Sequence, residues 1–363
     1  MKRESWKADA PSTGILKVCL APDDEVESAM REWESQYSID IVGGGLTRFI
    51  PYLFRRLSDL KIEARDYQII RGVYYKSWWF QTVHQKNNLA FLAHLDDGFP
   101  TFSLLKGVAL QQSVYSHDPR TRPCDDVDVL VNPRDRALAA DYLLARGFTL
   151  DGVYTLDYTM NFRKSASFVK GEISIDLCWG LYEYAANPDY LEAISLTQVE
   201  LEQGTFSVLS DTANLIHTCL HGAGWNRVPS TRWILDAALL IQKGKIDWDE
   251  FTATIIENSW QIPLIDQLQY LAEFGAVVPA KVLEDLQKSR KSISGRLMYF
   301  YLRQSKLNLR RLCRAKFSEY LIYVTLHGMK SSLRNYIFVE RMVLPNLVRE
   351  FKRSRPLVER DKN

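Results

Sequence analysis

The stretch RPCDDVDVLV, residues 122–131, decides the fold of this chain. Its second half is a short apolar run that is typical of a buried β-strand. Asp126 and Asp128 stand at positions i and i+2 of this stretch, so their side chains are expected to lie on the same face of a sheet. An isolated charge is costly to bury, and the pair therefore indicates a site where a partner neutralises the carboxylates.

Two neighbouring segments extend this pattern. FSLLKG, at 102–107, predicts a strand that ends in the turn Lys106-Gly107. ISIDLCW, at 173–179, lies in a strand candidate that carries Asp176. The three segments together predict a sheet with acidic side chains on one face.

Three aspartates on one face of a sheet repel each other unless a divalent cation lies between them. Oxygen-only ligands favour a hard cation such as Mg²⁺, with Mn²⁺ as the alternative metal. We expect metal ligation by Asp126, Asp128 and Asp176, with Asp176 serving as ligand or as general base. Aspartates at strand ends also commonly face solvent, and that structural reading stays open at this point. Metal ligation would suit two-metal phosphoryl or nucleotidyl transfer.

The turn before these strands suits a phosphate group. Gly107 would let a triphosphate approach the backbone, and the helix that follows offers free N–H groups at its start. Lys106 and Arg122 are the expected cationic partners of the phosphate oxygens.

The pattern along the chain predicts an α+β fold. Residues 99–182 alternate strand, helix, strand, helix, strand and strand, which makes a small mixed β-sheet. The flanking regions have mostly helical periodicity. We expect a flexible lead-in at 1–22, a helical region at 23–98, a helical domain that completes the cleft at 183–280, and a basic helical region at 281–363.

The chain resembles the uncharacterised bacterial nucleotidyltransferases of the DNA-polymerase-β-like superfamily, the group called NTP_transf_5. The resemblance covers roughly residues 40–265. It implies a palm-like mixed sheet, Mg²⁺ at the three aspartates and triphosphate contact near Lys106 and Gly107. The matching segments are LLKGVAL, RPCDDVDVLV and IDLCWGL, followed by LHGAGW and the helix TRWILDAALLI.

Two positions depart from the family pattern. The wider superfamily has Gly-Ser or Gly-Gly at the phosphate turn, where this chain has Gly107-Val108. The family's Asp-Leu-His-Trp becomes Asp-Leu-Cys-Trp, with Cys178 in place of the histidine. A thiol cannot reproduce the hydrogen bonds of an imidazole. All three carboxylates are present, so an active Mg²⁺-dependent nucleotidyltransferase is expected.

The expected reaction moves a nucleoside monophosphate from a nucleoside triphosphate, for example ATP, to an acceptor. The acceptor would be a hydroxyl, amine or phosphate of a small molecule, sugar, antibiotic, peptide or protein. Two alternatives remain open: an RNA-directed transferase that uses the basic C-terminal region, and a non-catalytic nucleotide-binding or regulatory module.

Charge is distributed unevenly along the chain. Residues 281–363 contain 20 Lys and Arg against 7 Asp and Glu, although the net charge of the whole chain is only +2. The basic region either packs on the acidic body or binds a polyanion or an anionic surface. No apolar run is long enough for a transmembrane helix, and scattered cysteines without a CxxC pair suggest free thiols in the cytoplasm.

Three further signals have competing interpretations. His217 and His221 have zincin-like spacing but lack the glutamate of that motif, so core or capping histidines are favoured over a place in the nucleotide cleft or a zinc site. Asp236 would pair with Arg232 on its own helix or orient a site residue. The adjacent tryptophans at 78–79 are expected to pack in the helical core.

Overall fold

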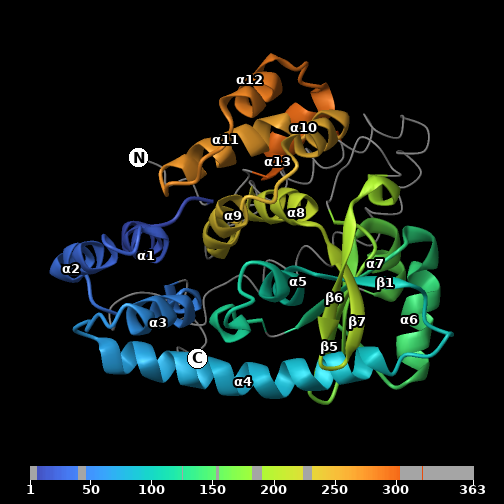
Figure 1. The fold of residues 1–363 in the computed structure, drawn as a ribbon. Helices are drawn as coiled ribbons and strands as arrows, with labels where there is room; N and C mark the ends of the chain where they lie inside the picture. The colour runs from blue at the N-terminus through green and yellow to red at the C-terminus, as the bar shows by residue number, and fades with distance from the viewer. Residues whose placement is uncertain are drawn as a thin grey trace, which may run out of the picture.

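A computed structural model describes residues 6–39, 46–124, 126–152, 155–181, 190–223, 231–302 and 321. These residues form an α+β fold with a mixed sheet and many helices (Figure 1). The strands are β1 (Phe102–Leu105), β2 (Val127–Val131), β3 (Thr149–Asp151), β4 (Ser165–Lys170), β5 (Ile173–Cys178), β6 (Leu196–Leu201) and β7 (Gly204–Leu209).

The helices fall before, within and after the sheet in chain order. The first group is α1 (Ala10–Leu20), α2 (Val26–Gln36), α3 (Ile50–Asp59) and α4 (Tyr67–Ala93). Between strands lie α5 (Lys106–Ser113), α6 (Arg136–Ala145) and α7 (Leu156–Phe162). After the sheet come α8 (Asp211–Ala223), α9 (Arg232–Gln242), α10 (Trp248–Glu257), α11 (Gln261–Ala272), α12 (Ala280–Lys288) and α13 (Ile293–Leu302).

Seven strands in the described part of the chain form one sheet, in the order β3-β4-β5-β2-β1-β7-β6. The central strand β2 pairs antiparallel with β1 and parallel with β5. β1 in turn pairs parallel with β7. The three strands expected to carry the site are therefore confirmed as neighbours at the centre of the sheet.

Two parts of the sheet differ from the sequence expectation. The hairpin β6–β7 lies in a region expected to be helical, and it extends the sheet beyond β1. The side chains of β6 are mostly exposed, so this edge strand lacks the apolar run that marks a buried strand. The order of elements expected for residues 99–182 also lacks helix α7, which lies between β3 and β4. Leu156 and Met160, four residues apart on this helix, both pack on the sheet core.

The two faces of the sheet differ in chemistry. One face is apolar and packs with buried side chains of α4 and α6, such as Leu92 and Leu143, in a single core cluster. Val127 and Val129 of β2 point into this core. Asp128, between them, therefore lies on the opposite face. That face borders the second core cluster, which contains residues of α8 and α9.

Several helix ends follow local rules that the sequence predicts. α6 and α9 end shortly before Gly147 and Gly244, which have φ values of +82° and +73° and so adopt the left-handed conformation that glycine tolerates. The Asp247 side chain caps α10 by accepting hydrogen bonds from Asp249 and Glu250 backbone N–H groups. Gly222 of α8 allows a close approach of α9, because a Cβ there would lie 2.1 Å from Cγ of Trp233.

Figure 1 shows α4 along one long edge of the molecule and α10 to α13 grouped on the opposite side. No helix in the described ranges is long and apolar enough to cross a membrane. Most of the basic region 281–363, from residue 303 with the exception of 321, falls outside the described residues, as do Gly224 and Trp225 of the LHGAGW segment.

Candidate functional site

The carboxylates of the candidate site converge on the centre of the sheet. Asp128 of β2 and Asp176 of β5 are direct partners across the parallel pair. Asp128 is buried, Asp176 is half-buried, and Asp126 is exposed just before β2 begins. Alternation along the strands puts Asp128 and Asp176 on the face opposite the apolar core. The structure thus brings together two strands that stand far apart in the sequence.

Lys106 lies at the point where β1 gives way to α5. Leu105, the residue before it, is the register partner of Asp128. The ammonium group of Lys106 forms an ion pair with the Asp128 carboxylate. Lys106 has a φ of 45°, a left-handed conformation that costs a residue other than glycine about 1–3 kcal/mol. Such strain is concentrated at functional sites, and here it places the ammonium group of Lys106 beside Asp128.

The electrostatics confirm that these groups are close enough to influence one another. Burial raises the pKa of Asp128 to about 6, and repulsion by Asp126 and Asp176 adds to this rise, while Lys106 opposes it. Burial alone would lower the pKa of Lys106, but the attraction of Asp128, Cys178 and Asp176 together with the hydrogen bond to Asp128 outweighs it, and the pKa lies above its ordinary value. The cluster therefore holds excess negative charge that a further cation would relieve.

The donor set of this cluster suits a hard divalent cation, because it consists of carboxylate oxygens. The negative charges of Asp126 and Asp176 raise the pKa of Asp128, and this repulsion is the observation that fits a cation between the three carboxylates. In the described parts of the chain, no three acidic, histidine or cysteine side chains are gathered as they stand into a metal site. Asp128 is instead bound to Lys106, and Asp176 accepts a hydrogen bond from the Ser167 hydroxyl. Each of these contacts uses only the Oδ1 atom of its carboxylate, so a metal would bind through Oδ2 or replace the present partner.

Gly107 is required by the loop that packs on it. A Cβ at this position would lie 2.6 Å from Cβ of Cys124 and 3.2 Å from Nη1 of Arg122. Any side chain would therefore push the segment before β2 away from the turn after β1. The sequence suggested Gly107 as a place for phosphate to approach; the structure adds this packing requirement.

Arg122 is buried, and the carboxylate of Asp236 holds its guanidinium. Its Nε donates to Oδ1 of Asp236 at 3.1 Å, and its Nη2 donates to Oδ2 at 2.9 Å. The Tyr115 hydroxyl donates to the same Oδ1 at 2.7 Å. This bidentate geometry fixes the guanidinium plane, and the Nη1 atom is left beside the Gly107 turn.

The same contacts decide between the two interpretations of Asp236. The Arg232 guanidinium donates to the Pro123 carbonyl, while the ion-pair partner of Asp236 is Arg122. The expected same-helix pair is therefore wrong, and Asp236 orients a residue of the candidate site. This contact joins α9 to the loop before β2, across more than a hundred residues of sequence.

The two histidines of α8 face the charged side of the sheet. Their rings stack, with centroids 6.1 Å apart. Burial lowers the pKa of His221 to about 3, and Lys106, Lys164 and Arg122 lower it further. The His221 side chain nevertheless keeps surface that is exposed to water. His217 is buried, in agreement with the core interpretation, while the place of His221 in a nucleotide cleft stays a prediction.

Lys164 lies beside the candidate site and was not predicted from the sequence. It precedes β4, and its Nζ donates to the Leu181 carbonyl at 3.1 Å. Its charge reaches Cys178 and both histidines. A lone lysine outside any motif gives no signal in the sequence, so only the pairing of β4 with β5 reveals its place.

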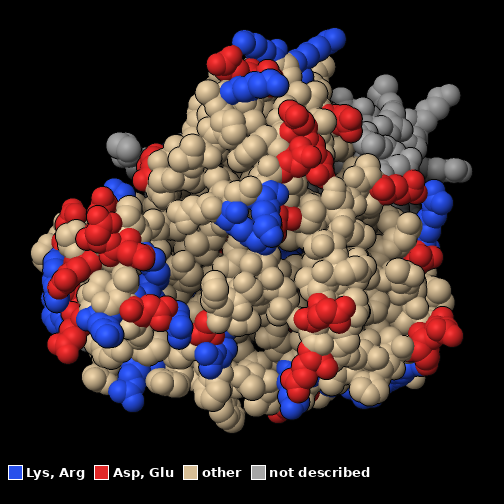
Figure 2. Space-filling view, viewed as in Figure 1, with Lys and Arg blue, Asp and Glu red and all other residues tan. Residues whose placement is uncertain are grey.

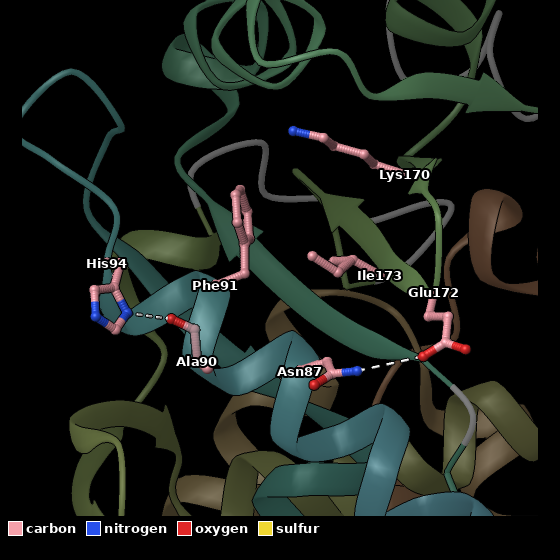
Figure 3. A pocket seen from close by; sticks show the side chains of 7 residues that line it. All are labelled: Asn87, Ala90, Phe91, His94, Lys170, Glu172 and Ile173. Atoms are coloured by element: carbon pink, nitrogen blue, oxygen red, sulfur yellow. Dashed lines mark hydrogen bonds between the residues drawn. The ribbon is translucent and has the colours of Figure 1, made fainter.

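A surface depression of about 510 Å³ lies elsewhere, between α4 and the turn from β4 to β5. Figure 3 shows its lining, including Asn87, whose amide donates to Glu172 at 3.5 Å, and His94, whose Nδ1 meets the Ala90 carbonyl. None of the predicted site residues lines this depression. It is therefore separate from the acidic cluster.

Comparison with known proteins gives one match. The profile of the family NTP_transf_5, described as uncharacterised nucleotidyltransferase, matches residues 50–276. None of the curated proteins and none of the solved structures matches the chain. The matched range holds β1, β2 and β5, the acidic cluster, Lys106 and the Arg122–Asp236 pair. Since the match covers more than half of the chain, the protein belongs to the uncharacterised nucleotidyltransferase family NTP_transf_5.

Proposed function

We propose that this protein is a Mg²⁺-dependent nucleotidyltransferase that moves a nucleoside monophosphate from a nucleoside triphosphate to an acceptor. The acceptor group is a hydroxyl, an amine or a phosphate. The observation that carries the proposal is the register of Asp128 opposite Asp176, with Lys106 bonded to Asp128. We assign the sheet to the palm type of the polymerase-β-like superfamily on the same basis.

The acidic residues take the metal-binding role in this proposal. Asp126, Asp128 and Asp176 hold the cation, and Asp176 stands on the side of the acceptor as ligand or general base. Bound Mg²⁺ lowers the pKa of the attacking group and neutralises the oxygens of the leaving pyrophosphate. The excess negative charge that raises the pKa of Asp128 supports this assignment.

Lys106 has two roles in the proposal, one without the metal and one with it. Without metal, its ammonium group compensates the buried charge of Asp128. With the carboxylate occupied, the ammonium group is free to bind phosphate oxygens of the triphosphate. Its partial exposure, 27% of the side chain, leaves room for this change of partner.

Arg122 and Gly107 shape the phosphate site. Asp236 binds the Nε and Nη2 atoms on one edge of the Arg122 guanidinium, so the remaining Nη1 is presented beside the Gly107 turn. The start of α5 follows immediately and supplies backbone N–H groups for an anion. Val108 provides no hydroxyl at this turn, so the backbone and the two cations do the binding.

A nucleotide-binding measurement tests the proposal. The thermal unfolding of the purified protein is followed with ATP, GTP, CTP and UTP, each with and without Mg²⁺. Because a ligand that binds the native state raises the melting temperature by mass action, we expect a Mg²⁺-dependent rise with at least one nucleotide. Asp128→Asn should abolish that rise, whereas Asp151→Asn, an exposed carboxylate on edge strand β3, should preserve it.

Turnover is then measured as pyrophosphate release with panels of acceptors. Loss of release in Asp126→Asn and Asp128→Asn with intact folding supports two-metal catalysis. Absence of any nucleotide-dependent shift would favour the non-catalytic binding module. Turnover that appears only with RNA and falls steeply with salt would favour the RNA-directed alternative. Turnover retained in the Asp126→Asn, Asp128→Asn double variant would refute the metal assignment.

A further inference from the structure

The outer face of α4 exposes large apolar side chains. Trp79 is 67% exposed, Tyr75 49% and Phe80 42%, and Ile69 and Val83 are also exposed. With 100° per residue, these five positions lie on one side of the helix. The sequence led us to expect Trp79 in the core, and this expectation is wrong; its neighbour Trp78 is half-buried. We call these five residues, with the basic residues described next, the outer α4 face.

The charge on this face has a single sign. Arg71, Lys76 and Lys86 are exposed on α4, and the 27 residues of this helix include no aspartate or glutamate. Lys76 stands within the apolar stripe, Lys86 lies on the same side of the helix beyond Val83, and Arg71 lies at the edge of the stripe. Acidic side chains contact the helix at Tyr74, whose hydroxyl donates to the buried Asp118, and near the far end, where Asn87 donates to Glu172. The face therefore combines aromatic rings with cations along most of its length.

The opposite side of α4 is firmly anchored. Ile70 and Tyr74 belong to the core cluster of the helical part, and Leu89 and Leu92 belong to the sheet core. Figure 1 shows the helix along the outer edge of the molecule, and Figure 2 shows a largely uncharged lower margin that carries Lys and Arg and also some Asp and Glu. The inner side fixes the helix, so the outer α4 face is a rigid, convex surface. From Ile69 to Val83 it extends about 21 Å.

Charge complementarity decides what this face fits. A second copy in antiparallel contact would bring basic residues of two α4 helices together. The region 281–363, with 20 basic and 7 acidic residues, is an equally poor electrostatic match. A single nucleic-acid strand is usually held in a groove that follows its backbone, whereas this face is convex and includes the aliphatic Ile69 and Val83. A flat anionic surface suits both the shape and the charge.

We propose that the outer α4 face is a peripheral membrane-binding surface for anionic phospholipids. Trp79, Tyr75 and Phe80 enter the headgroup region, where aromatic side chains are favoured. Arg71, Lys76 and Lys86 bind the negative headgroups. The helix lies parallel to the surface and does not span it. This inference is independent of the nucleotidyl transfer.

Vesicle co-sedimentation tests the proposal on the full chain. Vesicles of phosphatidylcholine alone are compared with vesicles that contain about a third phosphatidylserine, at low and physiological salt. We expect binding to the anionic vesicles only. Lys76→Glu should weaken it about tenfold or more, because each cation near an anionic surface contributes about fivefold. Trp79→Ser should also weaken binding by about tenfold, and Val277→Ser, an 82% exposed apolar residue away from α4, should leave it unchanged.

A second measurement identifies the face that touches the lipid. Brominated lipids quench tryptophans that enter the bilayer, and Trp79→Phe should keep binding while losing most of the quenching among the nine tryptophans. Unchanged quenching would place the contact elsewhere and overturn the proposal. Absence of binding to anionic vesicles would overturn it as well. The proposal would also be overturned if self-association or binding of single-stranded RNA depended on Trp79 while vesicle binding did not.

Discussion

Neutralising Asp236 should destabilise the protein far more than neutralising an exposed partner in an ion pair of similar length. Asp236→Asn keeps the shape of the side chain but removes the charge that faces Arg122, whose guanidinium is buried. Two charge-assisted hydrogen bonds at 3.1 and 2.9 Å are weakened, and the arginine charge remains uncompensated. Breaking one partner of a buried pair costs about 3–5 kcal/mol in the free energy of unfolding.

The assay is urea unfolding followed by circular dichroism, with three comparisons. Asp23→Asn breaks the Arg56–Asp23 pair, which is 2.7 Å long but has a 71% exposed aspartate, and should cost less than about 1 kcal/mol. Tyr115→Phe removes one hydrogen bond to Asp236 and should cost about 1–2 kcal/mol. The double variant Arg122→Met, Asp236→Leu removes both charges and should recover most of the loss. A cost for Asp236→Asn as small as that for Asp23→Asn would refute the reasoning.

Three further predictions concern the acidic face and its turn. The pKa of Asp128 is raised to about 6, so the contribution of this group to stability is present below about pH 4 and is lost as the pH rises through 6. The stability of metal-free Asp128→Asn relative to wild type, measured by urea unfolding, should therefore increase by up to about 3 kcal/mol between these pH values. A difference in stability that does not change with pH would contradict this. Lys106→Met should bind Mn²⁺ alone more tightly than wild type in titration calorimetry, because the ammonium group no longer competes for Asp128; equal affinity would disprove the competition. Gly107→Ala should weaken nucleotide binding and lower the melting temperature, since its Cβ would lie 2.6 Å from Cβ of Cys124, and adding Cys124→Gly should recover part of both losses.

The local parts of the site follow from the sequence because they depend on strand alternation. Asp126 and Asp128, at i and i+2, were expected on one face, and β2 places Asp128 there with its valine neighbours in the opposite core. The Lys106-Gly107 turn after β1 also follows, since an apolar run ends at a charged residue and a glycine. Such patterns require only the neighbours of a residue in the chain.

The remaining parts depend on contacts between distant segments. Nothing near Arg122 indicates that Asp236, on a helix 114 positions later, is its partner. The ion pair of Lys106 with Asp128 requires the antiparallel register of β1 and β2. The exposed strand β6 has no strong apolar signal of its own, and its position is set by pairing with β7. Contacts between distant segments determine both ion pairs and the position of β6, so the sequence pattern of a single segment could not predict them.

The parallel pairing of β1 with β7 affects the folding of the chain during synthesis and the choice of recombinant fragments. Leu104 of β1 pairs with Val208 of β7. One edge of β1 therefore has no strand beside it until the ribosome has synthesised the intervening hundred or so residues. An uncovered strand border is a template for pairing with other chains, and nascent proteins that expose one tend to aggregate. A recombinant fragment that stops near residue 182 would keep all three carboxylates yet leave that border open. Fragments intended for crystallisation or binding studies should therefore extend at least through α8.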